Sequence, residues 1–474
     1  MRHALPVLAV LAALPACSTN PATGERQLIL ISQSQEIAMG RQYDPQIIQT
    51  FGLVDDQALQ RYVQDLGARI AATSERPELP WTFRVVDDPV VNAFALPGGF
   101  IYVSRGILAH FDNEAQLAAV LGHEIGHVTA RHSAQQMSTQ QLAQIGLIAG
   151  MLIEPDLQQF GGLAVAGLQV LFLKHSRDDE RQADDLGLRY MQRARFDPRE
   201  MPDVFTMLER VSQARGGDGP PEWLSTHPNP GNRRERIEQT IAAGGPIPTA
   251  WAVNRDGYLQ RLEGMVFGDN PREGFFREQR FFHPDLRFQL DFPAGWRTSN
   301  QRDAVVAVSQ GQDAVVQVTL AEGATPDQAA RQFFAQEGVS GRHIPRRING
   351  IPAEIGTFRV TAQDGVLEGA VAFIGHGANV YRVLGYSAAA NWPRYEPVVQ
   401  RALDSFRELT DPALLDVQPT RLSIVRLDRP TPVTQLAGRS SVTPEVLALV
   451  NQTTAGATLP AGRLVKLPAG DRLP

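Results

Sequence analysis

The pentapeptide His-Glu-Ile-Gly-His at residues 123–127 constrains this chain more than any other feature. If the segment is helical, His123 and His127 project from one face, where their two imidazole nitrogens can bind one zinc ion. Glu124 lies beside them and can act as the general base toward a zinc-bound water, whose pKa zinc lowers. The pattern therefore predicts one Zn2+ per chain. The alternative is a surface helix that carries two histidines by chance.

A long helix is predicted around this motif, because Asn113 is a favourable N-cap. Gly122 and Gly126 weaken a helix, so we expect another backbone or a substrate to approach closely there. His110 and His132 are also near, and we expect them at the surface or in contact with a ligand rather than on the metal. Apolar residues recur at helical spacing and predict one buried side: Leu117, Val120, Leu121 and Val128.

Catalytic zinc usually takes three protein ligands and leaves one position for water. The best candidate for the third ligand is Glu180, in a second predicted helix that begins near Ser176. Asp184 shares its helix face, so one carboxylate could bind zinc while the other orients a ligand histidine. On spacing alone, Asp178 and Asp179 compete for this role. A charged, solvated helix face is the alternative to a metal site.

Four segments, in this order along the chain, resemble the HtpX-like and CAAX-prenyl-protease-like zinc metallopeptidases, which are gluzincins. The resemblance covers roughly residues 18–262. Its segments are Asn92–Val103, His123–His127, Ser176–Asp184 and Ser225–Pro228. The opening Asn-Pro-Ala-Thr-Gly-Glu-Arg-Gln-Leu, which begins at Asn20, resembles the periplasmic, BepA-like branch.

The resemblance implies a role for each matching residue. It implies a zinc ligand set and a general base: His123, His127 and Glu180 as ligands and Glu124 as the base. It further implies that Asp184 and Arg236 contact the ligands rather than the metal. His227 is expected to stabilise the transition state or to cap the metal in a resting form.

Residues 92–103 predict a hairpin of two short strands around Pro-Gly-Gly. An edge strand beside the metal could pair with an extended substrate through main-chain hydrogen bonds. This makes Asn92, Ala93 and Phe94 candidate substrate-binding residues. The residues alone equally support a simple core hairpin, and the family resemblance favours substrate binding.

Residues 1–17 are typical of a targeting segment, with Arg2 followed by an apolar run. The segment ends Leu-Pro-Ala-Cys, which resembles the lipobox of bacterial lipoproteins and makes Cys17 the predicted lipidation site. An ordinary signal-peptide cysteine is the alternative. Cys17 is the single cysteine of the chain, so a disulfide within it is excluded. Ser18 in place of aspartate favours an exported, lipid-anchored protein at the outer membrane, facing the periplasm.

The two most apolar stretches, 142–153 and 160–173, are shorter than the ~20 residues that span a bilayer. We expect two helices packed in the core, with a hydrophobic lid or membrane contact as the alternative. The chain carries 45 Lys and Arg against 51 Asp and Glu, and it has no basic patch with interleaved aromatics. Nucleic acid is therefore not an expected partner.

The expected fold class is α+β multidomain, because several domains are predicted for 474 residues. The predicted parts are a mainly helical metallopeptidase domain with a small sheet (18–262), a linker (263–280), an antiparallel α+β domain (281–409), a linker (410–420) and a βααβ module (421–470). The 281–409 domain vaguely resembles PsbP-like domains and is assigned substrate docking, partner contact or spacing. Two of its histidines, His343 and His376, are read as structural or exposed.

The 421–470 module resembles LysM modules, which bind glycan chains of peptidoglycan. Asn451 and the Pro-Ala-Gly turn fit that family. The loop Leu427–Thr431 lacks the glycine and acidic residue usual there, so peptidoglycan binding and protein contact both stay open.

Together these features predict a zinc-dependent endopeptidase of the bacterial cell envelope that acts on polypeptides. The resemblance implies misfolded or stalled envelope proteins as substrates. A wall-binding scaffold or chaperone with silent proteolysis is the first alternative, and the intact Glu124 argues against it. A structural zinc protein is the second, but such sites are usually rich in cysteine.

Overall fold

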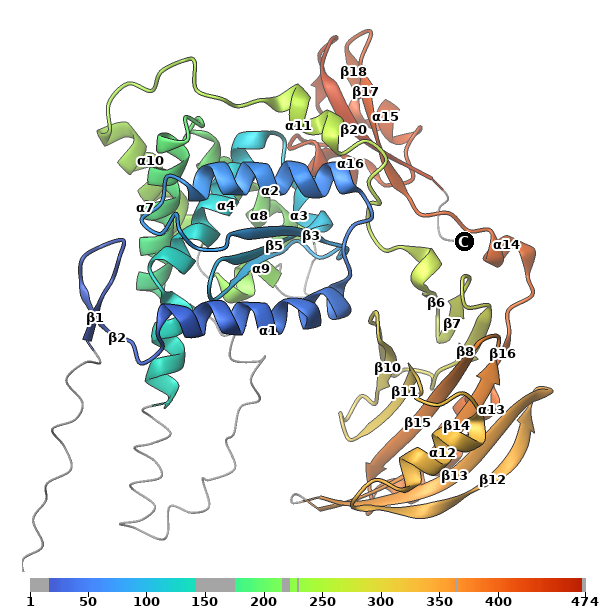
Figure 1. Ribbon diagram of the computed structural model, residues 1–474. Helices are drawn as coiled ribbons and strands as arrows, with labels where there is room; N and C mark the ends of the chain where they lie inside the picture. The colour runs from blue at the N-terminus through green and yellow to red at the C-terminus, as the bar shows by residue number, and fades with distance from the viewer. Residues whose placement is uncertain (1–16, 142–174, 215–221, 228–229, 363–364, 471–474) are drawn as a thin grey trace, which may run out of the picture. The chain divides into compact units, whose positions relative to one another are not determined.

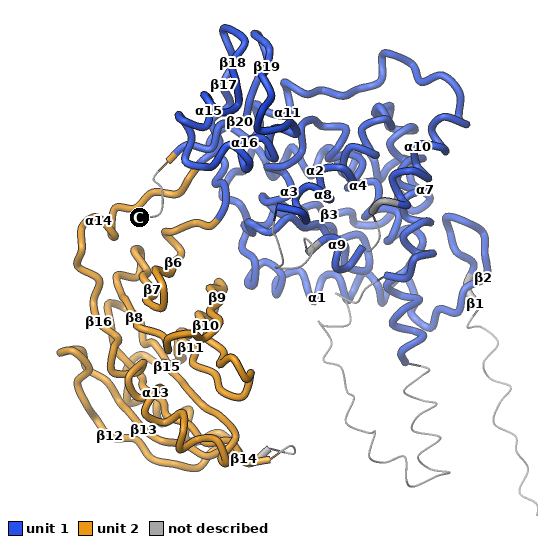
Figure 2. The backbone as a smooth tube through the Cα atoms, turned by 180° about the vertical axis from the view of Figure 1, so that it is seen from behind, with its two compact units in different colours: residues 1–268, 421–469 blue, residues 269–420, 470–474 orange. Residues whose placement is uncertain are grey.

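The computed structural model describes residues 17–141, 175–214, 222–227, 230–362 and 365–470. They form two compact units (Figure 2). Unit 1 runs to Gly268 and also takes in Arg421–Ala469, whereas unit 2 is Asp269–Thr420. Unit 2 is therefore an insertion in the sequence of unit 1.

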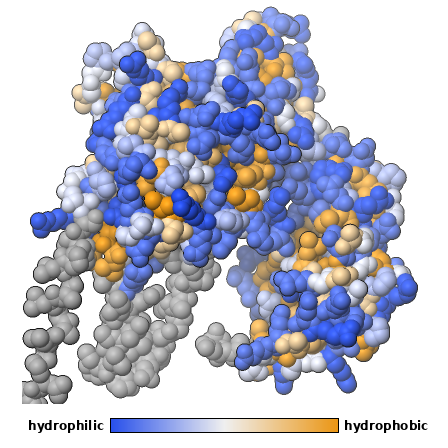
Figure 3. Space-filling model, in the orientation of Figure 1, coloured by the Kyte–Doolittle hydropathy of each residue, from blue (hydrophilic) through white to orange (hydrophobic). Residues whose placement is uncertain are grey.

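The apolar helices predicted at 142–153 and 160–173 lie outside the described residues, as does the targeting segment before Cys17. Among the helices that are described, none has the length and apolar character needed to cross a membrane. Figure 3 shows hydrophobic residues in separate patches among hydrophilic ones on the visible face.

A three-stranded sheet in the order β3-β5-β4 lies at the centre of unit 1 (Figure 1). Its strands are β3 (Thr82–Val86), β4 (Ala93–Leu96) and β5 (Phe100–Ser104). β4 and β5 form the predicted hairpin, and β4 is an edge strand of this sheet. The turn between them requires glycine, because Gly98 and Gly99 have φ values of +84° and +99°.

Alternate side chains of this sheet enter two different cores, as the pleat of a strand dictates. Phe83, Ile101 and Val103 join the main core with helices α2 and α4. Phe94 and Tyr102 point to the opposite face, which α1 covers through residues that include Ile47. Both faces are thus buried. The helices of this part are α1 (Gln33–Phe51), α2 (Gln57–Ala71), α3 (Arg105–His110), α4 (Glu114–Thr129), α7 (Arg177–Arg193), α8 (Glu200–Ala214), α9 (Glu222–Thr226), α10 (Pro230–Ala243) and α11 (Arg255–Arg261).

Helix α4 carries the His-Glu-Ile-Gly-His motif and is buried along its whole length. Its glycines allow α7 to pack directly on its backbone, as the sequence predicted. A Cβ atom at Gly126 would lie 2.9 Å from the Ala183 carbonyl oxygen, and one at Gly187 would lie 2.9 Å from the backbone nitrogen of His123. Helices α4 and α7 therefore approach more closely than side chains would permit.

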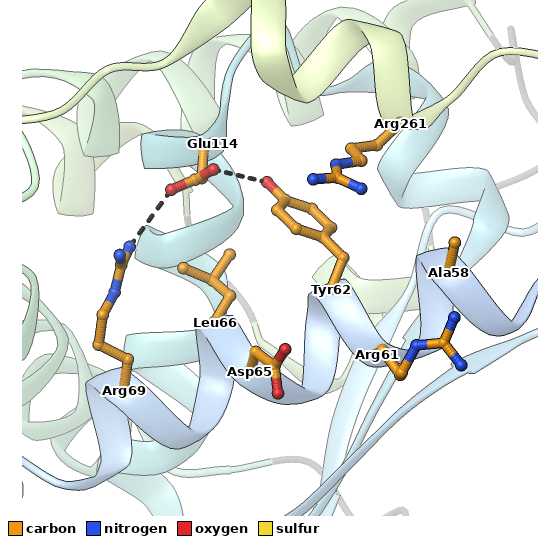
Figure 4. A pocket seen from close by; sticks show the side chains of 8 residues that line it. All are labelled: Ala58, Arg61, Tyr62, Asp65, Leu66, Arg69, Glu114 and Arg261. Carbon is orange, nitrogen blue, oxygen red and sulfur yellow. Dashed lines mark hydrogen bonds and ion pairs between the residues drawn. The ribbon is translucent and has the colours of Figure 1, made fainter.

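The first turn of α4 is fixed by several polar contacts. Asn113 caps it by accepting a hydrogen bond from the Gln116 N–H at 3.0 Å. Glu114, whose negative charge suits a helix N-terminus, accepts from the Tyr62 hydroxyl at 2.9 Å and pairs with Arg69 at 3.2 Å. Glu114, Tyr62 and Arg69 line a pocket of about 450 Å³, together with other residues of α2 and Arg261 of α11 (Figure 4). The start of α4 is thus anchored by contacts with α2 and by its own cap.

The C-terminal module has the predicted βααβ order. β17 pairs with β20 in antiparallel register, and a short β18–β19 ladder is added to this plan. The elements are β17 (Arg421–Arg426), β18 (Thr431–Pro432), α15 (Val433–Ala437), α16 (Pro444–Val450), β19 (Thr458–Leu459) and β20 (Leu464–Ala469). Asn451 is buried and holds β20 by bonding both the N–H and the carbonyl of Lys466.

This module is packed into unit 1 through a buried lysine. The Lys466 ammonium is fully buried and donates to the carbonyls of Ala109 and Phe111 at 2.9 and 2.6 Å, at the end of α3. Gln452 donates to the His110 carbonyl at 2.9 Å, and Leu464 joins the main core of unit 1. The module thus completes the junction between α3 and α4.

The burial of Lys466 predicts a dependence of stability on pH. Burial lowers the pKa of this lysine to about 7, although Asp112 opposes the shift, whereas the unfolded chain keeps a value near 10.5. Between these values the unfolded state binds more protons, so the free energy of unfolding should rise with pH by up to about 1.4 kcal/mol per pH unit. Among the other facing groups, Arg255 and Arg463 lower the pKa of Lys466 further, and burial lowers the His110 pKa to about 4.

The measurement is urea unfolding of the wild type and of Lys466→Met at pH 7 and pH 9. The wild-type free energy of unfolding should increase relative to that of the variant between these two values. Equal slopes for the two proteins would show that the lysine does not titrate in this window.

Unit 2 contains a seven-stranded antiparallel sheet in the order β12-β13-β14-β15-β11-β10-β9 and a four-stranded sheet in the order β16-β8-β7-β6. Helices α12 and α13 cover opposite faces of the larger sheet with separate cores. The elements are η2 (Pro271–Glu273), β6 (Phe275–Arg277), β7 (Arg280–His283), β8 (Phe288–Asp291), β9 (Arg297–Asn300), β10 (Ala304–Val308), β11 (Ala314–Leu320), α12 (Pro326–Phe334), β12 (Val339–Ile348), β13 (Ile351–Ala362), β14 (Gly365–His376), β15 (Asn379–Ala388), α13 (Trp392–Asp404), β16 (Arg407–Glu408) and α14 (Pro412–Leu415).

Both predicted linkers contain ordered structure. Strand β6 lies within 263–280. It pairs with β7 and its Phe275 is buried, so unit 2 begins before residue 281. Helix α14 lies within 410–420 and buries Leu414 in a small core that also contains Phe275. The two lone histidines have local partners. His343 lies 2.8 Å from Glu354, and His376 lies 2.9 Å from the Arg287 carbonyl.

Candidate metal centre

The candidate ligands predicted from the sequence meet in one buried cluster of unit 1. The Nε2 atoms of His123 and His127 are 3.0 Å apart. The Glu180 carboxylate lies 3.4 Å from His127 Nε2 and 3.6 Å from His123 Nε2. His227 joins them, and one ligand atom from each of the four residues lies within 4.8 Å of the others. Two imidazoles and a carboxylate that converge in this way fit the donor set of a catalytic zinc site.

The competing carboxylates of α7 lie outside this cluster. Asp178 is exposed and pairs with Arg181 at 2.9 Å. Asp179 caps α7 through Ser176 in a capping box. The helix therefore directs Glu180 alone, among its three acidic residues of the first turn, to the histidines.

The charge states of the cluster suit a metal. Burial lowers the pKa of His127 well below its ordinary value, and His175 lowers it further, so its imidazole is neutral. Burial would raise the pKa of Glu180, but His227 and Arg233 hold it well below its usual range. A neutral histidine and an ionised carboxylate are the forms that bind zinc.

Each ligand histidine has a partner on its other ring nitrogen. His123 Nδ1 lies 3.1 Å from the buried Asp184 carboxylate, which can accept a hydrogen bond from the ring N–H. His127 Nδ1 lies 2.9 Å from Nδ1 of His132, which is buried. Such partners fix the tautomer and the ring orientation of a ligand histidine. His110, the other histidine considered, lies outside the cluster and bonds the Gly106 carbonyl at 2.7 Å.

The sequence analysis missed the buried arginine of the site. Arg233, on α10, lies 2.6 Å from Asp184 and 2.6 Å from Glu180, and its guanidinium lies 4.8 Å from the centre of the Phe205 ring. Arg236, which the resemblance had indicated, is about one-third exposed, reaches Asp184 at 3.4 Å and pairs with Asp185 at 2.5 Å. Both arginines contact Asp184, and Arg233 alone of the two also reaches a candidate ligand.

His175 was also missed, because it precedes α7 and has no spacing relation to the motif. Its ring stacks on that of His127 with centroids 4.0 Å apart. Its backbone N–H donates to the Thr226 carbonyl at 3.2 Å, which ties the start of α7 to α9. Burial lowers the pKa of His175 to about 3, and His227 lowers it further. A neutral ring therefore covers His127.

Glu124 and His227 lie side by side next to the candidate ligands. The Glu124 carboxylate accepts a hydrogen bond from the Trp223 indole N–H at 3.3 Å and lies 3.6 Å from His227 Nε2. His227 Nδ1 lies 2.8 Å from Glu180. Burial would lower the pKa of His227, but the Glu180 and Glu124 carboxylates raise it. His227 thus lies between two carboxylates, one of which belongs to a candidate ligand.

The candidate substrate-binding residues lie at the edge of the sheet, on the strand that packs against α4. Asn92 exchanges hydrogen bonds with Ser104 of β5, and the Oδ1 atom of its side chain is buried with no hydrogen-bond partner in the described part of the chain. Phe94 stacks on Tyr102 at 4.9 Å. The backbone N–H of Trp223 donates to the Val91 carbonyl at 3.4 Å. This bond joins the segment before β4 to α9, the helix that precedes His227.

The fold and the site together define a metallopeptidase domain of the His-Glu-x-x-His class. Residues 57–241 match the family model described as "Peptidase family M48".

Relatives support the same assignment. The "Beta-barrel assembly-enhancing protease" of Yersinia pestis is 34% identical over 264 residues, 54% of each chain. The protein of the same name from Escherichia coli (strain K12) is 35% identical over 224 residues, 45% of each chain. "Mitochondrial metalloendopeptidase OMA1" of Arabidopsis thaliana is 37% identical over 219 residues, 45% of this chain and 42% of that one. The resemblance stated from the sequence is confirmed, and the chain spans about half the length of these relatives.

A solved structure of a cyanobacterial PsbP from Synechocystis sp. PCC 6803 matches with a TM-score of 0.23 and 16% identity, covering 27% of this chain and 91% of that one. At this score the match carries no conclusion about unit 2.

Proposed function

We propose that this protein is a zinc-dependent endopeptidase that hydrolyses peptide bonds in unfolded or stalled polypeptides of the cell envelope. The observation that supports this most is the convergence of His123, His127 and Glu180 in a buried site that also presents Glu124. These three side chains would hold the zinc ion. When bound, zinc lowers the pKa of a water and polarises the substrate carbonyl.

The protein's own groups move the proton. Glu124 accepts it from the attacking water and passes it to the leaving nitrogen, as a general base and then a general acid. The Trp223 indole, at 3.3 Å, holds the carboxylate in place. Asp184, backed by Arg233 at 2.6 Å, holds His123 in the tautomer that leaves Nε2 free for the metal.

Substrate is proposed to bind along β4. Asn92, Phe94 and Leu96 direct their backbone hydrogen bonds toward β5 in this antiparallel pair, which leaves the N–H and carbonyl groups of Ala93 and Ala95 directed to the free edge. An extended peptide added at this edge would run beside α4 and its Glu124.

The test is cleavage of unfolded casein by the chain from Ser18 onward, before and after removal of metal with a chelator. Cleavage should disappear with the metal and return on addition of one equivalent of Zn2+, because both carbonyl polarisation and water activation depend on it. Mass spectrometry of the products should show cuts inside the chain. Cleavage that persists in metal-free protein would overturn the proposal.

His227 is proposed to hold the enzyme latent by occupying the position that water needs. Its Nδ1 lies 3.3 Å from His123 Nε2 and 2.8 Å from Glu180, within the ligand cluster. His227→Ala should then raise casein cleavage several-fold with unchanged zinc content. A loss of activity with zinc still bound would instead assign His227 to stabilisation of the transition state.

The location of the protein and its partners belong to the same proposal. Cys17, the first residue of β1 (Cys17–Thr19), is proposed to carry a lipid anchor in the outer membrane, facing the periplasm. The name of the Yersinia pestis relative refers to β-barrel assembly, so unfolded β-barrel proteins are the first substrates to test. Peptidoglycan binding by the C-terminal module can be tested by sedimentation of the whole protein with purified cell wall.

A further inference from the structure

The loop from Asn20 to Glu25 joins β1 to its antiparallel partner β2 (Arg26–Leu28) and has a closed geometry. Asn20 is fully buried, and its Oδ1 accepts hydrogen bonds from the N–H groups of Ala22 at 2.8 Å and Thr23 at 3.3 Å. The Asn20 N–H donates to the Glu25 carbonyl at 2.7 Å, and the Gly24 N–H donates back to the Asn20 carbonyl at 2.9 Å. Because Oδ1 is held inside the turn, the Nδ2 group is presented outward.

This amide is the first member of a series of hydrogen bonds that ends on a candidate metal ligand. We call this series, which links Asn20, Gln182, His132 and His127, the relay. Asn20 Nδ2 donates to Gln182 Oε1 at 3.0 Å. The same oxygen lies 2.9 Å from His132 Nε2, and His132 Nδ1 lies 2.9 Å from His127 Nδ1. His127 and His132 are both buried.

One assignment of protons satisfies every member of this chain. His127 directs Nε2 to the ligand cluster, so its Nδ1 carries the proton and donates to His132 Nδ1. His132 must then carry its own proton on Nε2, from which it donates to Gln182 Oε1. That oxygen has two lone pairs and accepts from both His132 and Asn20. The carboxylate of Asp179 lies 3.7 Å from His132 Nε2, further than the amide oxygen.

We propose that Asn20, Gln182 and His132 are positioning residues that orient the metal ligand His127, so that the N-terminal loop forms part of the metal site. The inference rests on the proposed function in one respect, namely that the cluster binds Zn2+. It goes beyond it by linking the ligand to the segment that follows Cys17. The two ligand histidines are then oriented differently, His123 by one carboxylate and His127 by three residues in series.

The attachment of the N-terminal segment does not depend on this chain of hydrogen bonds. Ile29 and Ile31 pack on Ala134 in a small core of their own, and the Leu30 N–H donates to the Ser138 hydroxyl at 2.9 Å. Substitution of Asn20 therefore breaks the first hydrogen bond of the relay and leaves this anchor in place. The effect on the metal can thus be separated from loss of the segment.

The experiment measures zinc affinity by competition with a chromophoric chelator and records the visible absorption spectrum of the Co2+-loaded protein. Gln182→Leu should weaken zinc binding about 10- to 100-fold, the usual cost of removing a group that orients a ligand, and should shift the Co2+ bands. Asn20→Ala should act in the same direction with a smaller effect. Gln182→Glu keeps an acceptor oxygen and should restore both readouts. Thr23→Ala, in the same loop but outside the relay, is the matched control and should match the wild type.

The outcomes separate this inference from the proposed function. A wild-type protein that binds neither Zn2+ nor Co2+ would overturn both. Normal zinc affinity and an unchanged Co2+ spectrum in Gln182→Leu and Asn20→Ala would overturn the relay alone. The unfolding temperature of the metal-free variants is measured in parallel. A lower temperature with unchanged metal readouts would show a purely structural role and would also overturn it.

Discussion

Replacing Glu124 by glutamine is expected to reduce casein cleavage by roughly 10²- to 10⁴-fold, the contribution that a positioned general base makes. Glutamine keeps the shape of the side chain but cannot accept the proton of the attacking water. Glu124 is buried and is not among the candidate ligands, so zinc content should stay at one per chain. Cleavage is followed by the release of fluorescent peptides, and zinc by elemental analysis.

A matched control is Glu235→Gln, an equal change of charge at an exposed position of α10. This variant should cleave like the wild type. A Glu124→Gln protein that keeps more than a tenth of the wild-type activity with zinc bound would contradict the role of Glu124 as base. Loss of zinc from the variant would point to a structural role for the carboxylate instead.

The second large effect is expected at Arg233. Arg233→Ala should destabilise unit 1 by about 3–5 kcal/mol, because it leaves the buried Asp184 and Glu180 carboxylates without their counter-charge. Arg236→Ala, three residues along the same helix, should cost less than about 1 kcal/mol, because its side chain is partly exposed and pairs mainly with Asp185. Urea unfolding of the metal-free proteins measures both.

Equal losses in the two variants would contradict this ranking of the arginines. Zinc supplies positive charge next to Glu180, so it should restore part of the stability of Arg233→Ala. A shift in the urea midpoint on adding zinc that is larger for this variant than for Arg236→Ala would support that account. The comparison therefore tests both the burial of the pair and the presence of the metal beside it.

The parts that local rules determine could be predicted from the sequence. The spacing of His123 and His127 on one helix, the capped start of the second helix and the glycine turn of the β-hairpin all depend on neighbouring residues. The βααβ order of the C-terminal module follows from its alternating apolar runs and turns in the same way.

The choice between Arg233 and Arg236 could not be predicted, because both lie on one helix at a spacing that gives them similar directions. Their different depths are set by Phe205 and Trp223, which come from α8 and α9 and pack on one guanidinium. The burial of Lys466 is of the same kind. A lysine between apolar residues in a strand suggests a solvent-facing position, and only the carbonyls at the end of α3 reveal its partners.

The position of the C-terminal module in the sequence has a consequence for the order in which the protein can mature. Residues 421–469 emerge from the ribosome after Asp269–Thr420, yet Lys466 and Leu464 complete the packing around the start of α4. A nascent chain that ends before residue 421 therefore has the candidate ligand residues but lacks part of the packing around α4. The candidate metal site would thus reach its final packing only after residues 421–469 have been made.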